Sequence, residues 1–249
     1  MVQRQWDTID PVFSVDDKHL ACNIPATPPP SHIPIAAGDE ITAVYWFWLH
    51  PVGPMTVWLA RCGDTVDACQ DVDVNQIGWF KIWEAGLLEG PNLAEGVWYQ
   101  KKFQKWDGSP ALWPVAIPSN IKAGGYIIRH EILSIHIENK PQFYPQCAHL
   151  SVNGTGTAQP PEEFLYKFPG GYAADGESIY LWISDVGLAW NGMHWTRGSW
   201  NGRDAFCLMG VGGIADDRWE TITDPSIRIN IYGPQFDNTT VSFSSPCSL

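Results

Sequence analysis

Residues 129–147 read RHEILSIHIENKPQFYPQC, a stretch that predicts two neighbouring β-strands with polar side chains set among apolar ones. Alternate side chains of a strand point to the same face. One such face of the first strand carries His130, Ile132, Ser134 and His136. In the second strand Gln142 and Tyr144 share a face, with the apolar Phe143 between them. Polar groups lined up on a buried face need partners, and a metal or reactive site is one way to supply them.

Each histidine taken alone is most simply a satisfied core or surface residue. The His130-Glu131 pair does not make a zinc-protease motif, because that motif places two histidines four residues apart on a helix. His130 and His136 are six residues apart, which on a strand separates them by about 20 Å. The two rings therefore cannot share one metal ion without a sharp bend, and Glu131 points to the opposite face.

A second segment, residues 45–60, reads YWFWLHPVGPMTVWLA and places a histidine at a corner. An aromatic strand ends at His50, and a Pro-Val-Gly-Pro turn leads into a second apolar strand. Pro51 and Pro54 restrict the backbone whereas Gly53 relaxes it, so His50 is held at a rigid corner. A histidine at a strand end beside a stiff turn suits a metal ligand.

The rest of the chain predicts an all-β fold with little helix. The 249 residues suit one domain, and 23 glycines with 20 prolines favour many turns between short strands. Alternating segments predict strands at 40–49, 55–61, 125–137 and 142–152. We expect a single domain over residues 1–249, an immunoglobulin- or fibronectin-III-like β-sandwich with long loops. A short helical turn is expected near residues 92–97.

The charge of the chain argues against two classes of partner. A net charge of −12 and an isoelectric point of about 4.8 disfavour nucleic acid and anionic membranes, because both bind basic patches. No apolar run reaches the length of a membrane span. A neutral polysaccharide imposes no such charge requirement. A plain glycoside hydrolase is disfavoured, because no pair of carboxylates stands out at a candidate site.

Long motifs occur along the chain in a specific order. They are LACN at 20–23, AAGDEITAVYWFWLHPVGPMTVWLARC at 36–62, GWFKIWEAGLLEG at 78–90, WYQKKFQKWDGSPALWPVAIPSNIKAGGYIIRHEILSIH at 98–136 and KPQFYPQCAHLSVNGTGTA at 140–158. In this order they resemble the fungal lytic polysaccharide monooxygenases of auxiliary-activity family nine, formerly glycoside hydrolase family sixty-one. The resemblance is dense over residues 11–172, and the HPVGPM turn is similar to one subgroup.

The resemblance implies a copper enzyme that cleaves β-1,4-glucan such as cellulose by oxidation at C1 or C4. Oxygen or peroxide would be the oxidant, and a small reductant or a redox enzyme the electron donor. By the same resemblance His50 is a copper ligand and Tyr144 lies near the axial position. His136 and Gln142 steer the oxygen species from outside the metal. This agrees with the chemistry of the residues, because imidazole suits copper and outer hydrogen bonds tune a metal.

The family's copper site also uses the amino group and ring of a histidine at the mature N-terminus. This sequence begins Met1-Val2-Gln3-Arg4, without that histidine and without a signal-peptide pattern. A truncated gene model is favoured over true divergence, because the other site residues are retained. The rival hypothesis is a catalytically inactive relative that binds cellulose or cell-wall glucan without redox turnover.

Residues 175–222 have no counterpart that we recognise in the family. An unstructured insertion of this length is unusual in a compact domain. The segment is either a lid or binding loop, or it is translated intron sequence from mis-splicing. The second reading is favoured, since the start of the chain also departs from the family. A loop would offer sugar-stacking rings from Trp190, Trp195 and Trp200. His194 is not expected to be a ligand.

The 14 tryptophans of the chain divide into core and surface candidates. Most of those in apolar or family-like stretches are expected in the core. These are Trp46, Trp48, Trp58, Trp79, Trp83, Trp98 and Trp113. Flat exposed rings bind sugars by stacking, and Tyr172 is the candidate for such a face.

The six cysteines form an even set, for which free buried thiols are the alternative to disulfides. The family resemblance pairs Cys22 with Cys147. Cys62 and Cys69 are close enough in sequence to form a local bridge. No pairing is assigned to the last two, Cys207 and Cys247.

Two glycosylation sequons begin at Asn153 and Asn238, and they favour secretion. Together with the family resemblance they predict an extracellular protein. We also expect it to be a monomer.

Overall fold

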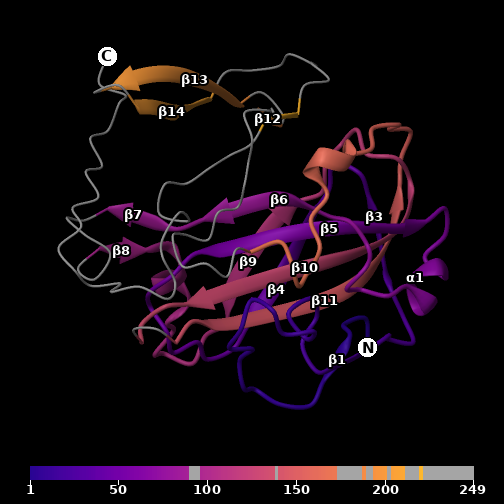
Figure 1. Cartoon of the computed structure of the whole chain (residues 1–249), viewed down its shortest axis with the longest axis horizontal. Helices are drawn as coiled ribbons and strands as arrows, with labels where there is room; N and C mark the ends of the chain where they lie inside the picture. Colours follow the sequence, from indigo (N-terminus) through magenta and orange to yellow (C-terminus); the bar gives the residue numbers. More distant parts are fainter. Residues whose placement is uncertain are drawn as a thin grey trace.

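The computed structural model describes residues 1–89, 96–137 and 140–172, together with the backbone of four short strands farther along the chain (Figure 1). Those strands are β12 (Gly187–Leu188), β13 (Met193–Trp200), β14 (Arg203–Gly210) and β15 (Trp219–Glu220). Most regular structure in these residues is β-strand, with one short α-helix and two 3-10 turns. The all-β class predicted from the sequence is confirmed.

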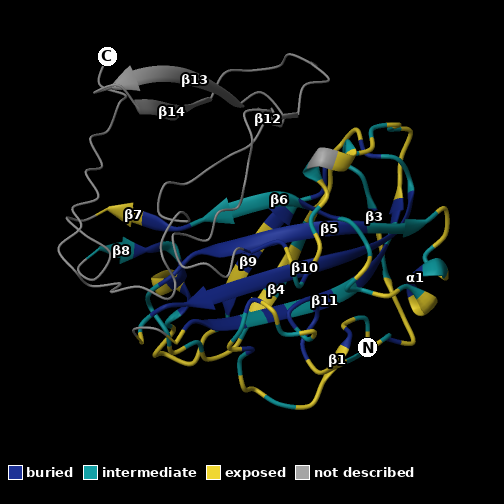
Figure 2. Cartoon of the chain, in the orientation of Figure 1, coloured by how far each residue is buried: buried dark blue, intermediate teal, exposed yellow. Residues whose placement is uncertain are grey.

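The main layer is a five-stranded sheet in the order β3-β11-β10-β5-β6. Its strands are β3 (Ile33–Ala36), β11 (Gln142–Asn153), β10 (Gly124–Ser134), β5 (Met55–Gly63) and β6 (Trp79–Ala85). Neighbours run antiparallel, except that β3 pairs with β11 in parallel. Every residue of the central strand β10 is buried, because both of its faces are covered (Figure 2).

A ribbon of β4 (Glu40–Tyr45) and β9 (Ala111–Ala116) packs on one face of this sheet. Ile128 and Ile132 of β10 share a hydrophobic core with Trp113 of β9. His130 lies on this same face, as its parity predicted, and its ring centroid is 4.9 Å from that of Trp113. The two layers form the β-sandwich that the sequence predicted.

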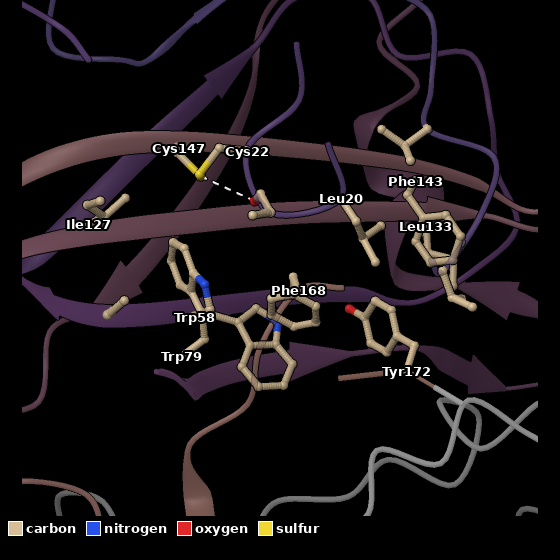
Figure 3. Packing of buried hydrophobic residues seen from close by; sticks show 14 of the residues in the cluster. Leu20, Cys22, Trp58, Trp79, Ile127, Leu133, Phe143, Cys147, Phe168 and Tyr172 are labelled. Atoms are coloured by element: carbon tan, nitrogen blue, oxygen red, sulfur yellow. Dashed lines mark hydrogen bonds between the residues drawn. A yellow bond between two sulfur atoms is a disulfide. The ribbon is translucent and has the colours of Figure 1, made fainter. Parts of the chain in front are cut away.

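The opposite face of the sheet is covered by loops. Trp58 packs there with Phe168 and Tyr172, which come from the segment after β11 (Figure 3). Arg129 and Glu131 form a buried ion pair on this face, with Nη2 of the arginine 2.7 Å from Oε1 of the glutamate. The alternation along β10 therefore sends neighbouring side chains into two separate cores.

Two disulfides join loops to the sheet. Cys22 of the segment before β2 (Pro25–Thr27) bonds to Cys147 in the middle of β11. Cys62 near the end of β5 bonds to Cys69 in the short helix α1 (Ala68–Asp71). Both pairs are the ones expected from the sequence.

Three of the predicted strands agree with β5, β10 and β11 to within a few residues. The fourth, predicted over 40–49, ends at Tyr45, where the pairing of β4 with β9 stops. Phe47 has φ 59°, in the left-handed region rather than the β region, so the alternating pattern continues in sequence after the strand has ended.

The remaining described elements are short. They are β1 (Gln5–Trp6), β7 (Leu87–Glu89), β8 (Val97–Trp98) and the 3-10 helices η1 (Tyr99–Phe103) and η2 (Glu162–Phe164). The helical turn expected near 92–97 falls mostly on residues outside the described ranges, and η1 begins just after it.

The segment 175–222 contains regular backbone, although its sequence shows no clear period. Strands β13 and β14 pair antiparallel with Met193 opposite Gly210, and β12 pairs with β15. Whether the segment is a lid or translated intron stays a prediction. Its side chains and those near the end of the chain lie outside the described residues, namely Trp190, His194, Trp195, Trp200, Cys207, Asn238 and Cys247.

Candidate functional site

The loop between β4 and β5 presents His50 beside the end of β10. It leaves β4 after Tyr45 and enters β5 at Met55. Gly53 has φ +132°, and a Cβ there would lie 2.0 Å from the carbonyl oxygen of Leu133, so only glycine fits. The Pro-Val-Gly-Pro turn thus packs directly against β10 and forms a tight corner.

A buried glutamine, Gln100 of η1, holds this loop on both sides of His50. Its amide oxygen accepts a hydrogen bond from the indole nitrogen of Trp48 at 3.0 Å. Its amide nitrogen donates to the carbonyl oxygens of Gly53 at 2.7 Å and Leu133 at 3.0 Å. Because Gln100 is completely buried, water cannot replace its bonds to the two carbonyl oxygens.

His136 follows the end of β10 and stacks on His50. The two ring centroids are 4.3 Å apart and the ring planes differ by 17°. The hydroxyl of Ser134 lies 2.6 Å from Nδ1 of His136, which fixes the orientation of that ring. The stacked pair therefore comes from two segments that are far apart in the sequence.

Tyr144 and Gln142 reach the same point from the start of β11. The phenol oxygen of Tyr144 lies 3.1 Å from Nε2 of His50, and its hydroxyl donates to Oε1 of Gln142 at 2.8 Å. Since the phenol has a single proton, Nε2 of His50 acts as the donor toward it in this arrangement. Trp48 meets the rings of Tyr144 and His50 edge to face, with centroids 4.9 Å and 5.3 Å away.

The titratable groups of this cluster are neutral at neutral pH. Burial, and then the like charge of His136, lower the pKa of His50. Burial also lowers the pKa of His136. The pKa of Tyr144 is raised to about 12, first by burial and then by the negative charge of Asp10. A neutral imidazole is the form that binds a metal ion.

The cluster fits a copper ion in the kind of donor that it offers. An imidazole nitrogen and a phenol oxygen converge within 3.1 Å, and imidazole is a ligand that suits copper. Within the described ranges, no group of three or more His, Cys, Asp or Glu side chains is placed to hold a metal ion. These ranges therefore supply one strong nitrogen donor, His50, and one weak oxygen donor, Tyr144.

The structure brings together the four residues that the sequence singled out as a copper site. These are His50, His136, Gln142 and Tyr144. His130 lies apart from them beside Trp113, and its Nε2 has no hydrogen-bond partner. Glu131 faces the other side of the sheet, as expected, where it binds Arg129.

Tyr172 is not an exposed sugar-stacking ring, so that expectation is wrong. Its side chain is 6% exposed, and its ring stacks on Phe143 with centroids 5.6 Å apart. Its hydroxyl donates to Glu131 of the buried ion pair. Because the polar end of the ring finds its partner inside the protein, the whole side chain packs into the core (Figure 3).

The expected core tryptophans are buried or partly buried, with one exception. Trp58, Trp79, Trp98 and Trp113 are buried, and Trp48 and Trp83 pack against a core. Trp46 is 68% exposed, because β4 ends one residue before it.

Comparison with known proteins identifies the family. The model of Auxiliary Activity family 9, formerly GH61, matches residues 1–188. The chain belongs to this family. It is 39% identical over 183 residues to the AA9 family lytic polysaccharide monooxygenase B of Heterobasidion irregulare (strain TC 32-1), covering 72% of each chain. It is 35% identical over 194 residues to the AA9 family lytic polysaccharide monooxygenase D of Thermothelomyces thermophilus, covering 76% of this chain and 73% of that one.

A solved structure agrees with the family assignment. The crystal structure of a cellulose-active polysaccharide monooxygenase from M. thermophila matches with a TM-score of 0.64 and 34% identity, covering 71% of this chain and 78% of that one. The protein is thus an enzyme of the lytic polysaccharide monooxygenase kind, and the general activity of its family is oxidative cleavage of polysaccharide. No helix in the described part of the chain is long and apolar enough to cross a membrane.

Three side chains of the site were not singled out from the sequence. Trp48 was placed with the core tryptophans, Ser134 was noted only for its parity, and Gln100 was not noted at all. Gln100 lies in the run WYQKKF, where a glutamine between aromatic and basic residues gives no signal of burial. Its role depends on three contacts with other segments, which no local pattern records.

Proposed function

We propose that this protein cleaves β-1,4-glucan, such as cellulose, by copper-dependent oxidation at C1 or C4. Oxygen or peroxide is the oxidant, and a small reductant or a redox enzyme supplies electrons. The observation that carries the proposal is the convergence of His50 Nε2 and the phenol oxygen of Tyr144 at 3.1 Å. Their flanking by His136 and Gln142 supports it, as does membership of the family.

In this proposal His50 gives up the proton on Nε2, the nitrogen that faces Tyr144, and would hold copper through that nitrogen. Bound copper supplies one-electron redox chemistry toward oxygen or peroxide. Tyr144 stays a protonated phenol, because its pKa is raised to about 12, and a neutral phenol is a weak ligand. Oε1 of Gln142 accepts a hydrogen bond from the phenol at 2.8 Å and so keeps the lone pairs of the phenol oxygen turned toward His50.

His136 acts beside the metal rather than as a ligand. Ser134 engages its Nδ1 at 2.6 Å, so Nε2 is the nitrogen that can hold or deliver a proton. Its ring lies flat against His50, which limits how far that imidazole can turn. The pair therefore combines a metal ligand with a proton-transfer group in one stacked unit.

The family resemblance implies two further nitrogen ligands, from the amino group and ring of a histidine at the mature N-terminus. Residues 1–249 hold no match for that histidine at their start. Mass spectrometry of the protein secreted from its native source tests whether the mature chain carries it. A mature chain that begins with histidine supports the enzyme, whereas one that begins at or after Met1 removes support for tight copper binding.

Copper titration of the full chain tests the role of His50. We expect His50→Ala to weaken copper binding by about 100-fold and to abolish release of oxidised oligosaccharides from cellulose. His32→Ala is the matched control, because His32 is exposed and takes no part in the cluster. Equal copper affinity of His50→Ala and the parent chain would overturn the assignment of this ligand.

A second candidate is an inactive relative that binds cellulose or cell-wall glucan without redox turnover. The observation that favours it is the small number of metal donors within the described ranges. It predicts micromolar or weaker copper binding together with retained adsorption to cellulose. Tight copper binding with oxidised products excludes it.

We further propose that the protein is extracellular, monomeric and glycosylated at Asn153. Asn153 is exposed at the end of β11, where a glycan would meet no core residue. The two disulfides support an oxidising compartment. Mass analysis before and after glycosidase treatment, and sedimentation of the secreted protein, test these points.

A further inference from the structure

Four large apolar side chains stand exposed around the loop that carries His50. We call them the aromatic patch. They are Trp46 at 68%, Phe47 at 67%, Leu49 at 49% and Trp106 at 70% exposure. Single exposed apolar residues are ordinary, but a cluster of this kind marks a binding surface.

Two loops far apart in the sequence build the aromatic patch together. The rings of Phe47 and Trp106 meet edge to face, with centroids 6.3 Å apart and planes at 85°. The amide of Gln104 donates to the carbonyl oxygen of Leu49 at 2.5 Å. The loop after η1 is thereby fastened to the loop after β4.

The backbone of Phe47 is held in an unfavourable conformation. Its φ of 59° lies in the left-handed region, which costs a bulky residue energy that its surroundings must supply. Burial of the Phe47 ring does not supply this energy, since Phe47 is 67% exposed to solvent. Such strain at an exposed ring points to a function for the ring itself.

The aromatic patch continues directly into the candidate copper site. Leu49 is the neighbour of His50 in sequence, and Trp48 between the patch residues contacts both His50 and Tyr144. A polysaccharide that lies over His50 therefore also lies over part of the patch. Continuity with the catalytic cluster makes the substrate the occupant that fits best.

We propose that the aromatic patch binds single, disordered β-glucan chains in preference to flat crystal faces. This inference rests on the proposed function. Aromatic rings bind sugars by stacking on the apolar C–H face of the ring. Because Phe47 and Trp106 stand at 85°, the two rings cannot both lie flat on one planar surface. A single chain can turn between successive sugars and meet both.

The test measures adsorption of the full chain to swollen amorphous cellulose and to microcrystalline cellulose, without added copper or reductant. We expect Phe47→Ala with Trp106→Ala to weaken binding to amorphous cellulose by about tenfold. Binding to the crystalline form should change less than about twofold. Trp6→Ala is the control, because Trp6 is an exposed aromatic residue on β1, outside the patch.

Three results would overturn the proposal. One is unchanged binding to amorphous cellulose, and a second is an equal loss on both forms. The third is self-association of the parent chain that the double variant abolishes. Each variant must keep the thermal midpoint of the parent chain. The single variant Phe47→Tyr keeps a stacking ring at the strained position and leaves Trp106 intact, so it must bind amorphous cellulose as well as the parent chain does.

The copper measurement separates this inference from the proposed function. If the parent chain releases oxidised products while the double variant adsorbs normally, the aromatic patch is refuted and the enzyme stands. If the double variant loses adsorption while the parent chain shows no copper-dependent oxidation, the patch stands and the redox function is refuted.

Discussion

Replacing Gln100 with leucine tests whether one buried amide holds the His50 loop in place. The substitution removes the bonds to the indole nitrogen of Trp48 and to the carbonyl oxygens of Gly53 and Leu133. Leucine is similar in size but offers no polar atom. The experiment therefore changes hydrogen bonding while largely keeping the packing.

The expected loss follows from these three groups. A buried polar group left without its partner costs about 1–3 kcal/mol. The two carbonyl oxygens carry most of this, because Trp48 is only partly buried and water can reach its indole. The extra apolar surface of leucine returns roughly 1 kcal/mol. We expect the free energy of unfolding to fall by about 2–4 kcal/mol.

Urea denaturation measures this loss as a lower midpoint at unchanged slope. Gln104→Leu is the matched control, because the one hydrogen bond that it removes is exposed to solvent, and it should change the free energy of unfolding by no more than about 0.5 kcal/mol. We also expect Gln100→Leu, but not Gln104→Leu, to weaken copper binding at His50. A Gln100→Leu protein as stable as the parent would refute the reasoning.

Three further predictions concern the core. Burial lowers the pKa of His130 from 6.5 to about 4. Between these two pH values the imidazole is protonated in the unfolded chain and neutral in the folded protein. The free energy of unfolding should thus fall by about 3 kcal/mol as the pH drops from 6.5 to 4. The urea midpoint of His130→Leu should change less with pH over this range than the midpoint of the parent chain does. Glu131→Ala leaves the guanidinium of Arg129 buried without its carboxylate and should cost about 3–5 kcal/mol by calorimetry; a cost below about 1 kcal/mol would contradict the ion pair. Alanine at both Cys22 and Cys147 removes a disulfide that spans 125 residues of sequence and should cost about 4–5 kcal/mol in urea; full reduction of the parent chain should cost at least as much, because it also opens Cys62–Cys69.

The sheet was predictable where local pattern and burial agree. The alternation along 125–137 and 142–152 predicted β10 and β11, because a strand buried on both faces still separates its two sets of side chains. The same rule placed His130 and Glu131 on opposite faces. It failed after Tyr45, where the apolar pattern runs on but Phe47 leaves the strand conformation.

The candidate site was predictable in its residues but not in its contacts. His50 at a proline-bounded corner and the pair Gln142 and Tyr144 stood out by type and spacing. Tyr172 was misplaced, because sequence shows that a tyrosine could stack on sugar but not that its hydroxyl meets Glu131 inside the protein. A tyrosine ring can be buried when its hydroxyl finds a hydrogen-bond partner inside the protein, and that partner comes from a distant part of the chain.

The sequence by itself determined the strand periodicity, the stiff corner at His50, the net negative charge and the residue types of the candidate copper site. These are properties of neighbouring residues, which a local pattern records. Only the tertiary structure decided that His136 stacks on His50, that Gln100 holds the loop, and that Phe47 meets Trp106 at the surface. Each of these depends on the register of strands far apart in the chain, and long-range register is set by packing of the whole sandwich rather than by any one segment.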